Sequence, residues 1–161
     1  MRDSFLSLGA ERHHASASAR DPLRTRNSQK TGRSTSRESA ASTKRTALVV
    51  DDVSDVTEML SVLLSHAGYA VVTAASAPQA LIAANEFQFD VIISDIGMPG
   101  MNGYQLAREL RQLPGYENVP LVAVTGYSMF DDRERSKSAG FNAHMTKPID
   151  PSALLELIEQ L

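Results

Sequence analysis

Five short strand-like runs recur between residues 47 and 146, and each is followed by a segment with helical periodicity. The runs span residues 47–50, 69–74, 91–93, 121–124 and 142–146. Most of them are continuously apolar, which is typical of strands covered on both faces, because a half-exposed strand alternates apolar and polar residues. Strands that alternate with helices favour a parallel sheet with helices on both of its faces. The sequence therefore predicts an α/β fold.

The segments between the runs carry the start and stop signals of helices. The first has apolar residues at helical spacing, with Ser54 as its candidate N-cap and Gly68 as its end. Pro78 suits the first turn of the second helix, where its missing N–H leaves no hydrogen bond unmade. The last four helices are predicted over residues 78–87, 104–112, 131–138 and 151–161.

The first 45 residues differ in composition from the rest of the chain. Residues 1–46 carry ten Lys and Arg side chains against four acidic ones, a balance of +6, whereas the remainder has a balance of −9. Their only apolar cluster is Phe5, Leu6 and Leu8, which is too little apolar area to offset the ordering of the backbone. We therefore expect residues 1–45 to be a disordered basic arm and residues 46–161 to be the folded domain.

Three roles remain open for this arm. Its charge suits electrostatic binding to nucleic acid or a membrane surface, and its Arg- and Ser-rich composition suits an organelle transit peptide. A solvated tail, for instance one that results from a start site assigned too far upstream, has the same composition. The arm has neither interleaved aromatic residues nor a basic helical pattern, so nucleic-acid binding is not specifically indicated.

Composition excludes several classes of protein. The chain has no cysteine, which excludes disulfides, thiolate metal sites and a cysteine nucleophile. No apolar run approaches the roughly 20 residues that cross a bilayer. The N-terminus also lacks the apolar core of a secretory signal. We therefore expect a soluble, cytoplasmic protein without a membrane span.

Polar side chains follow four of the five predicted strands. They are Asp51, Asp52, Asp95, Thr125 and Lys147. In an open α/β sheet, ligands collect outside the carboxyl ends of the strands, so these residues are the candidates for a site. A single Asp at a strand end is ordinarily a polar residue that leaves the sheet for solvent. A set of five at four strand ends favours a functional site.

These residue types suit phosphoryl transfer. Carboxylates held close together repel one another, and a hard divalent cation relieves the repulsion. Oxygen ligands without His or Cys favour Mg²⁺. A carboxylate can also attack phosphorus and form an acyl phosphate, with the Lys147 ammonium and the Thr125 hydroxyl placed to stabilise the transferring oxygens. The chain has neither a P-loop nor a dinucleotide fingerprint, so the phosphoryl group is expected to come from another molecule.

The motifs around these residues are Val50-Asp51-Asp52, residues 94–103, Val124-Thr125-Gly126 and Lys147-Pro148. Together with the spacings of 30 residues from Asp95 to Thr125 and 22 from Thr125 to Lys147, they resemble the response-regulator receiver family over residues 46–161. Residues 125–128 and 140–148 are similar to receivers at the ends of hybrid sensor kinases. The resemblance implies a flavodoxin-like, doubly wound (βα)5 fold with a five-stranded parallel sheet in the order 2-1-3-4-5.

The resemblance also implies a role for each site residue. Asp95 is the phosphorylation site. Asp51, Asp52 and Asp95 hold Mg²⁺, and the backbone carbonyl of Gly97 is a further ligand. Thr125 moves toward the phosphoryl group on activation.

Three more positions have roles by resemblance, and Gly97 has a second one. Lys147 contacts the phosphoryl group, and the peptide bond that joins it to Pro148 is expected to be cis, a geometry that is accessible at low cost only before proline. Gly97 and Tyr127 stand where family members tune the rate of dephosphorylation.

His144 departs from the pattern of the best-known receivers, which have Tyr or Phe as a switching aromatic three residues before the lysine. One interpretation is a tolerated polar residue at the edge of the last strand. The other is an imidazole that swings inward on phosphorylation and makes the switch weakly dependent on pH.

The function implied is that of a single-domain response regulator. A sensor histidine kinase or a histidine phosphotransfer protein would supply the phosphoryl group, with Mg²⁺ as cofactor. The domain would not be an enzyme beyond its own phosphorylation and dephosphorylation. We expect no effector domain after Leu161. Output is then expected through contact with an unknown downstream protein, through transfer of the phosphoryl group to a histidine phosphotransfer protein, or through the N-terminal arm. A homodimer through the last helices is possible.

Two alternatives are weighed against this function. A phosphatase of the haloacid dehalogenase type also uses a nucleophilic Asp at a strand end, but it needs an acid/base Asp two residues later, where this chain has Gly97. A degenerate receiver would bind partners without phosphorylation. It is disfavoured because all five site residues are present.

Overall fold

A computed structural model describes residues 43–126 and 130–161, with the side chains of residues 130–132 left out of the description. Five parallel strands form one sheet in the order β2-β1-β3-β4-β5. The strands are β1 (Thr46–Val50), β2 (Ala70–Ala74), β3 (Val91–Asp95), β4 (Leu121–Thr125) and β5 (Ala143–Thr146). The predicted doubly wound α/β fold and its strand order are confirmed.

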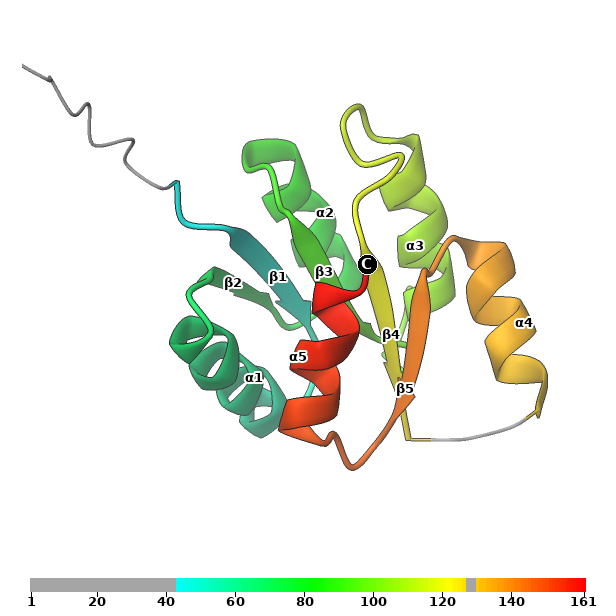
Figure 1. The fold of residues 1–161 in the computed structure, drawn as a ribbon. Helices are drawn as coiled ribbons and strands as arrows, with labels where there is room; N and C mark the ends of the chain where they lie inside the picture. Colours follow the sequence, from blue (N-terminus) through cyan, green and yellow to red (C-terminus); the bar gives the residue numbers. More distant parts are fainter. Residues whose placement is uncertain (1–42, 127–129) are drawn as a thin grey trace, which may run out of the picture. The chain divides into compact units, whose positions relative to one another are not determined.

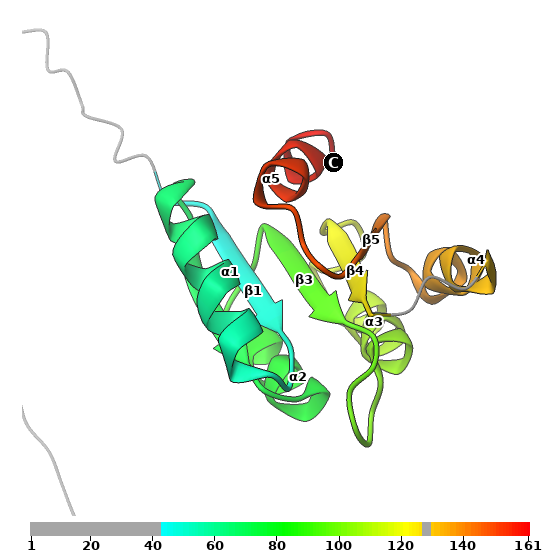
Figure 2. The ribbon, with the colours of Figure 1, turned by 90° about the horizontal axis from the view of Figure 1, so that it is seen from below.

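Helices cover both faces of the sheet (Figures 1 and 2). They are α1 (Ser54–His66), α2 (Ala77–Glu86), α3 (Gly103–Gln112), α4 (Phe130–Ala139) and α5 (Pro151–Glu159). One apolar cluster joins the sheet to α1 and α5, and another joins it to α2, α3 and α4. No helix within residues 43–126 and 130–161 is long and apolar enough to cross a membrane.

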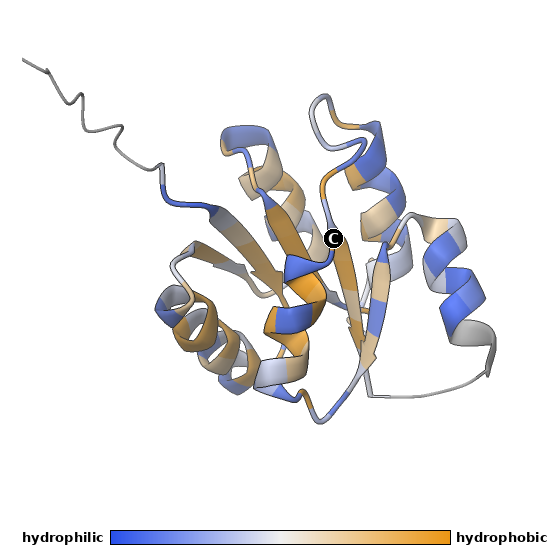
Figure 3. Ribbon diagram, in the orientation of Figure 1, coloured by the Kyte–Doolittle hydropathy of each residue, from blue (hydrophilic) through white to orange (hydrophobic). Residues whose placement is uncertain are grey.

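The central strand β1 shows why the apolar runs are continuous. Ala47 and Val49 pack toward α1 and α5, whereas Leu48 and Val50 pack toward the opposite face. All four are at most 1% exposed. Side chains alternate between the faces of a strand, so a strand covered on both faces needs apolar residues at every position. Figure 3 shows this character as hydrophobic colouring along the central strands.

The helix boundaries correct one prediction. Val53, not Ser54, is the N-cap of α1, and no side chain caps this helix. The N–H of Val53 instead donates to the Asp51 carboxylate at 2.9 Å, so the start of α1 is tied to the end of β1. Pro78 lies in the first turn of α2, as predicted, and Ser76 is the N-cap of this helix.

The strand register brings the polar strand ends to one edge of the sheet. Val50 pairs with Ser94, and Asp95 pairs with Val124. Thr125 pairs with Thr146, the last residue of β5. All strands run in the same direction, so their carboxyl ends meet at this edge.

Arg111 on α3 joins loops at the opposite end of β4 and β5. Its guanidinium donates to the carbonyl oxygens of Gly140, Tyr116 and Val119 at 2.7–3.0 Å and to the Asn142 Oδ1 at 2.8 Å. Burial lowers the pKa of Arg111. The planar guanidinium has five N–H donors and can donate to several carbonyl oxygens at once. Arg111 therefore holds the loops that carry these carbonyls together.

Two predictions fall on residues that the structure leaves undescribed. The basic arm over residues 1–45 lies almost wholly within residues 1–42, and its disorder stays a prediction. Tyr127 lies within residues 127–129, so its role in dephosphorylation also stays a prediction.

Candidate functional site

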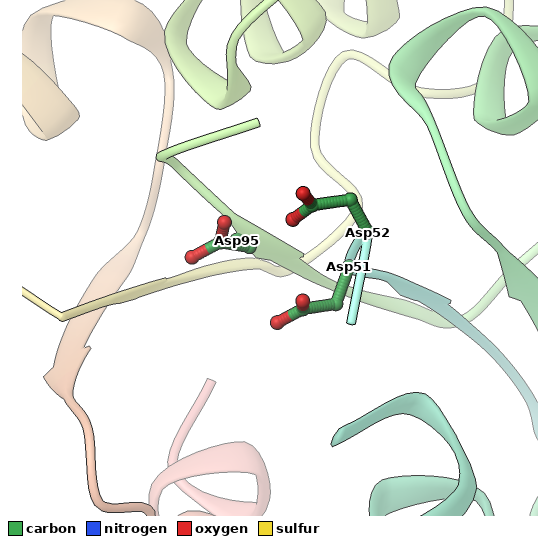
Figure 4. A group of neighbouring side chains, drawn as sticks. All are labelled: Asp51, Asp52 and Asp95. Atoms are coloured by element: carbon green, nitrogen blue, oxygen red, sulfur yellow. The ribbon is translucent and has the colours of Figure 1, made fainter. Parts of the chain in front are cut away.

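Three carboxylates meet at the carboxyl edge of the sheet (Figure 4). Asp51 and Asp52 follow β1, and Asp95 ends β3. Each offers an oxygen, and these oxygens lie within 4.8 Å of one another. Asp51 and Asp95 are buried at 2% and 6% exposure, whereas Asp52 is exposed. The predicted metal-binding carboxylates are therefore brought together, with one of them open to solvent.

Lys147 is the cation of this cluster. Its Nζ lies 2.7 Å from the Asp51 Oδ2 and 3.3 Å from the Asp95 Oδ1. The lysine comes from the segment after β5, and its backbone N–H donates to the Thr125 carbonyl at 2.8 Å, which fixes where the side chain begins. One ammonium therefore serves two buried carboxylates.

Burial is the largest influence on the Asp95 carboxyl and raises its pKa above the ordinary value of 3.8. The positive charge of Lys147 lowers this pKa, and the negative charge of Asp51 raises it, but the net direction is upward. Burial also lowers the pKa of Lys147. The hydrogen bond to Asp51 and the charges of Asp95 and Asp51 outweigh that influence and leave the Lys147 pKa raised. The site therefore keeps its ammonium charged and disfavours the ionised form of Asp95.

The backbone of Asp95 is enclosed by a glycine whose importance the sequence did not reveal. A Cβ on Gly103 would lie 2.4 Å from the Asp95 carbonyl oxygen and 2.7 Å from the Ile96 Cα, closer than atoms can approach. The Gly103 N–H also donates to the Ile96 carbonyl at 3.0 Å. Only glycine allows α3 to begin this close to the end of β3. The sole signal in the sequence is a glycine directly before the predicted helix.

Gly97 adjoins the Asp95 carboxylate, and Thr125 lies at the end of the neighbouring strand β4. A Cβ on Gly97 would lie 3.7 Å from the Asp95 Oδ2, so this residue adjoins the carboxylate. Thr125 ends β4 and is 5% exposed. The Ile96 N–H donates to the Val124 carbonyl at 3.0 Å, which keeps the ends of β3 and β4 in step.

His144 lies on β5, half-buried, and its Nδ1 is 3.2 Å from the Ser136 Oγ on α4. Ser136 is 2% exposed, and no motif in the sequence pointed to it. The peptide bond between Lys147 and Pro148 is cis, the geometry that the resemblance implied.

Comparison with known proteins assigns the family. The model of the response regulator receiver domain matches residues 47–159. The chain belongs to this family. Members of this family are signalling modules. In this chain, the cluster of Asp51, Asp52 and Asp95 lies at the carboxyl edge of the sheet.

Relatives of known sequence support the assignment. This receiver is 37% identical over 113 residues to an uncharacterized 14.6 kDa protein in the sodA1 3′ region of Leptolyngbya boryana, covering 70% of this chain and 86% of that protein. It is 37% identical to the virulence sensor protein BvgS of Bordetella bronchiseptica, but covers only 10% of its length. The match to ycf29, a probable transcriptional regulator of Porphyra purpurea, covers about half (54%) of the length of that protein.

Solved structures agree with the fold. The chemotaxis protein CheY4 of Vibrio cholerae superposes with a TM-score of 0.70 at 33% identity, over 73% of this chain and 98% of CheY4. The receiver domain of the sensor histidine kinase PA1611 from Pseudomonas aeruginosa superposes with a TM-score of 0.67 at 28% identity, over 73% of this chain and 96% of that domain. That structure has a magnesium ion coordinated in its active site cleft.

Proposed function

We propose that this receiver accepts a phosphoryl group on Asp95 and signals by the conformational change that follows. The observation that carries the proposal is the buried Asp95 carboxylate, which adjoins Asp51 and Asp52 and has the Lys147 Nζ 3.3 Å from its Oδ1. A carboxylate can act as a nucleophile toward phosphorus, and fixed cations stabilise the charge on the transferring oxygens.

The chemical step is a displacement at phosphorus. An oxygen of Asp95 forms a bond to phosphorus while the bond from phosphorus to the donor imidazole nitrogen breaks. The imidazole leaves with that electron pair and takes up a proton from water. Lys147 would contact the phosphoryl oxygens, a role that the 3.3 Å distance from its Nζ to the Asp95 Oδ1 supports. Thr125, at the neighbouring strand end, supplies a hydroxyl to the same group.

Mg²⁺ fits this set of donors. Asp51, Asp52 and Asp95 offer carboxylate oxygens and no nitrogen or sulfur ligand, and the exposed Asp52 leaves room for the waters that Mg²⁺ retains. When bound, the ion would offset the charge of three carboxylates and of the incoming phosphoryl group. The Gly97 carbonyl is a proposed further ligand. His, Cys, Asp and Glu form no other potential metal-binding group in the part of the chain that the structure describes.

The proposed donor is a sensor histidine kinase or a histidine phosphotransfer protein. Two observations support this class: similarity to part of the sensor protein BvgS and to the receiver of a histidine kinase from Syntrophus aciditrophicus, which superposes with a TM-score of 0.66 at 29% identity. The output we propose is a phosphorylation-dependent contact with another protein. Phosphorylation adds charge and acceptor oxygens around which the loops after β4 and β5 can reorganise.

The phosphatase alternative lacks support at the site. It needs a second carboxylate two residues after the nucleophile, and that position is Gly97, which has no side chain to donate or accept a proton. The proposed catalysis is therefore confined to the domain's own phosphorylation and dephosphorylation.

Incubation with acetyl phosphate and Mg²⁺, followed by intact-mass analysis, tests the proposal. We expect the protein to gain one phosphoryl group, and chelation of the metal to suppress the gain. Asp95→Ala should gain none, whereas Asp55→Asn, a change at an exposed aspartate of α1, should behave like the unmodified protein. A phosphoryl gain that persists in Asp95→Ala, or no gain in the unmodified protein, would overturn the proposal.

A further inference from the structure

A cleft of about 450 Å³ lies between α3 and α4, which are neighbouring helices on one face of the sheet (Figure 1). Its first wall runs from Asn102, the N-cap of α3, to Arg108, and its second wall runs from Glu134 to Ser138 on α4. The carboxylate cluster contributes none of the described residues that line it. A cleft of this size can hold a small molecule. It is therefore a second candidate binding site, separate from the one that contains Asp95.

Two arginines line the cleft, one on each wall. They are Arg108 on α3 and Arg135 on α4, and both side chains are exposed. The described residues include no carboxylate in an ion pair with either arginine, although Glu134 lines the same cleft. A guanidinium group binds phosphate or carboxylate oxygens through two parallel hydrogen bonds. Two such groups in one cleft indicate an anionic ligand.

A cation–π contact joins the two walls. The guanidinium carbon of Arg135 lies 5.5 Å from the centre of the Tyr104 ring on α3. This contact restricts a long side chain, so that less conformational freedom is lost when a ligand binds. It engages the face of the planar guanidinium, and the N–H donors at the edge of the group are left for the ligand.

The N-cap of α3 adds two amide donors to the cleft. The Gln105 N–H donates to the Asn102 Oδ1 at 3.0 Å, and the Asn102 N–H donates to the Gln105 Oε1 at 3.1 Å. Both amide oxygens are thus used as acceptors in this capping box, which leaves the NH₂ groups of the two side chains as donors to a ligand. The described lining therefore offers four nitrogen donor groups and one carboxylate, that of Glu134.

This set of donors suits a phosphoryl group better than a carboxylate. A carboxylate has two oxygens, and a single guanidinium can bind both of them. A phosphoryl group has three terminal oxygens and accepts hydrogen bonds from several directions, as donors on two helices require. The carboxylate of Glu134 would repel a free phosphate ion, but it can accept a hydrogen bond from a hydroxyl group on a larger ligand. The lining therefore favours a phosphate ester.

We propose that this cleft binds a small phosphate ester, whose phosphoryl group pairs with Arg108 and Arg135 and whose hydroxyl groups donate to Glu134. Sugar phosphates and nucleotides share this chemistry. A nucleotide also has a base, which can stack on the Tyr104 ring or on the Arg135 guanidinium. The phosphoryl group stays on the ligand, so the proposal does not depend on phosphorylation of Asp95.

The test titrates ribose 5-phosphate and adenosine 5′-monophosphate into the full-length isotope-labelled protein, with ribose and adenosine as matched probes without phosphate. A chelator keeps metal away from the carboxylate cluster, so that no ion at that site retains the phosphoryl group. We expect the phosphorylated probes, and not ribose or adenosine, to shift the amide signals of residues 102–108 and 134–138. Added salt should weaken the binding, because the ion pairs are exposed. Tighter binding of adenosine 5′-monophosphate identifies a nucleotide site, and equal or tighter binding of ribose 5-phosphate identifies a sugar phosphate site.

Arg108→Gln with Arg135→Gln should lower the affinity for the phosphorylated probes about tenfold, since each exposed pair contributes up to about fivefold. The matched control is Arg133→Gln with Lys137→Gln, which removes the same charge from side chains that do not line this cleft. It should bind the probes about as well as the unmodified protein. Circular dichroism of each variant checks that the fold is retained.

Four results would each overturn the proposal of a phosphate ester site. They are no binding of either phosphorylated probe, the same signal shifts with ribose or adenosine, signal shifts confined to other elements, and an equal loss of affinity in both double variants.

Discussion

The Nζ of Lys147 lies 2.7 Å from the Oδ2 of Asp51, although 96 residues separate them in the chain. The lysine is 25% exposed at its side chain and the aspartate 2%. The same ammonium reaches Asp95 at 3.3 Å. In the protein without metal, this ion pair offsets much of the repulsion between two buried carboxylates. The cation of the proposed phosphoryl site is therefore also a stabilising element of the metal-free domain.

Lys147→Met should destabilise the protein, because it leaves Asp51 and Asp95 without their ammonium. We expect a loss of about 1–3 kcal/mol in the free energy of unfolding by urea when a chelator is present. Mg²⁺ should reduce the loss, since the ion takes over part of the neutralisation. Lys137→Met, which changes an exposed lysine with no described ion pair, is the control and should lie close to the unmodified protein. Equal losses in both variants would contradict this role.

Asp95→Asn should stabilise the metal-free protein at neutral pH. The pKa of Asp95 is raised in the folded state, so the folded protein holds this proton more tightly than the unfolded chain does. Its contribution to stability is present below the ordinary pKa of 3.8 and is lost as pH rises through the raised pKa. The Tm of the variant should therefore exceed that of the unmodified protein by a few degrees at neutral pH, and the gap should close in acid. A gap that does not change with pH would contradict the assignment.

Gly103→Ala should lower both stability and phosphorylation. Its Cβ would meet the Asp95 carbonyl oxygen at 2.4 Å, so the end of β3 or the start of α3 must move. We expect a loss of about 1–3 kcal/mol, typical of overpacking, and slower gain of phosphate from acetyl phosphate. Gly126→Ala is a matched control, because no atom of the described residues, its two chain neighbours aside, lies within 4 Å of the added Cβ. Unchanged stability in Gly103→Ala would contradict the need for glycine at this position, because the backbone would then move aside at little cost in free energy.

Arg111→Gln should destabilise the fold without removing the phosphoacceptor. The change takes away donors from the carbonyls of Gly140, Tyr116 and Val119. We expect a loss of about 2–4 kcal/mol, because hydrogen bonds from a charged group are strong and partly buried carbonyls lose a partner. Arg108→Gln, on the exposed side of the same helix, should change stability by less than about 0.5 kcal/mol. Urea unfolding measures the first effect, and intact mass after acetyl phosphate should still show one phosphoryl group.

An NMR titration of His144 with and without a phosphoryl mimic separates the two interpretations of this residue. If the imidazole swings inward on phosphorylation, it leaves the Ser136 Oγ, now 3.2 Å away, and its pKa should differ between the two states. If His144 is only a tolerated residue on the edge strand, the two pKa values should agree. Ser136→Ala is the reference for the loss of the Ser136 hydroxyl, including its contact with His144.

Most of the fold could be predicted from the sequence because the signals are local. The continuous apolar runs identify strands buried on both faces, and Ala47–Val50 in β1 pack to opposite sides as such a run requires. The start of α1 was misplaced by one residue for a tertiary reason. The Asp51 side chain, from the preceding strand end, accepts the Val53 N–H and holds Val53 at the N-cap position. The Val56 N–H, which a capping side chain would accept, donates instead to the Val53 carbonyl at 3.1 Å.

The sequence by itself determined the α/β class and indicated the candidate site residues, since Asp51, Asp52, Asp95, Thr125 and Lys147 each end or follow a strand. Only the tertiary structure decided how these residues pair. The contact of Lys147 with Asp51, the approach of α3 that requires Gly103, and the contact of His144 on β5 with Ser136 on α4 all join segments far apart in the chain or in different elements. Such contacts depend on the packing of whole elements, and the local hydrophobic periodicity of the sequence does not predict them.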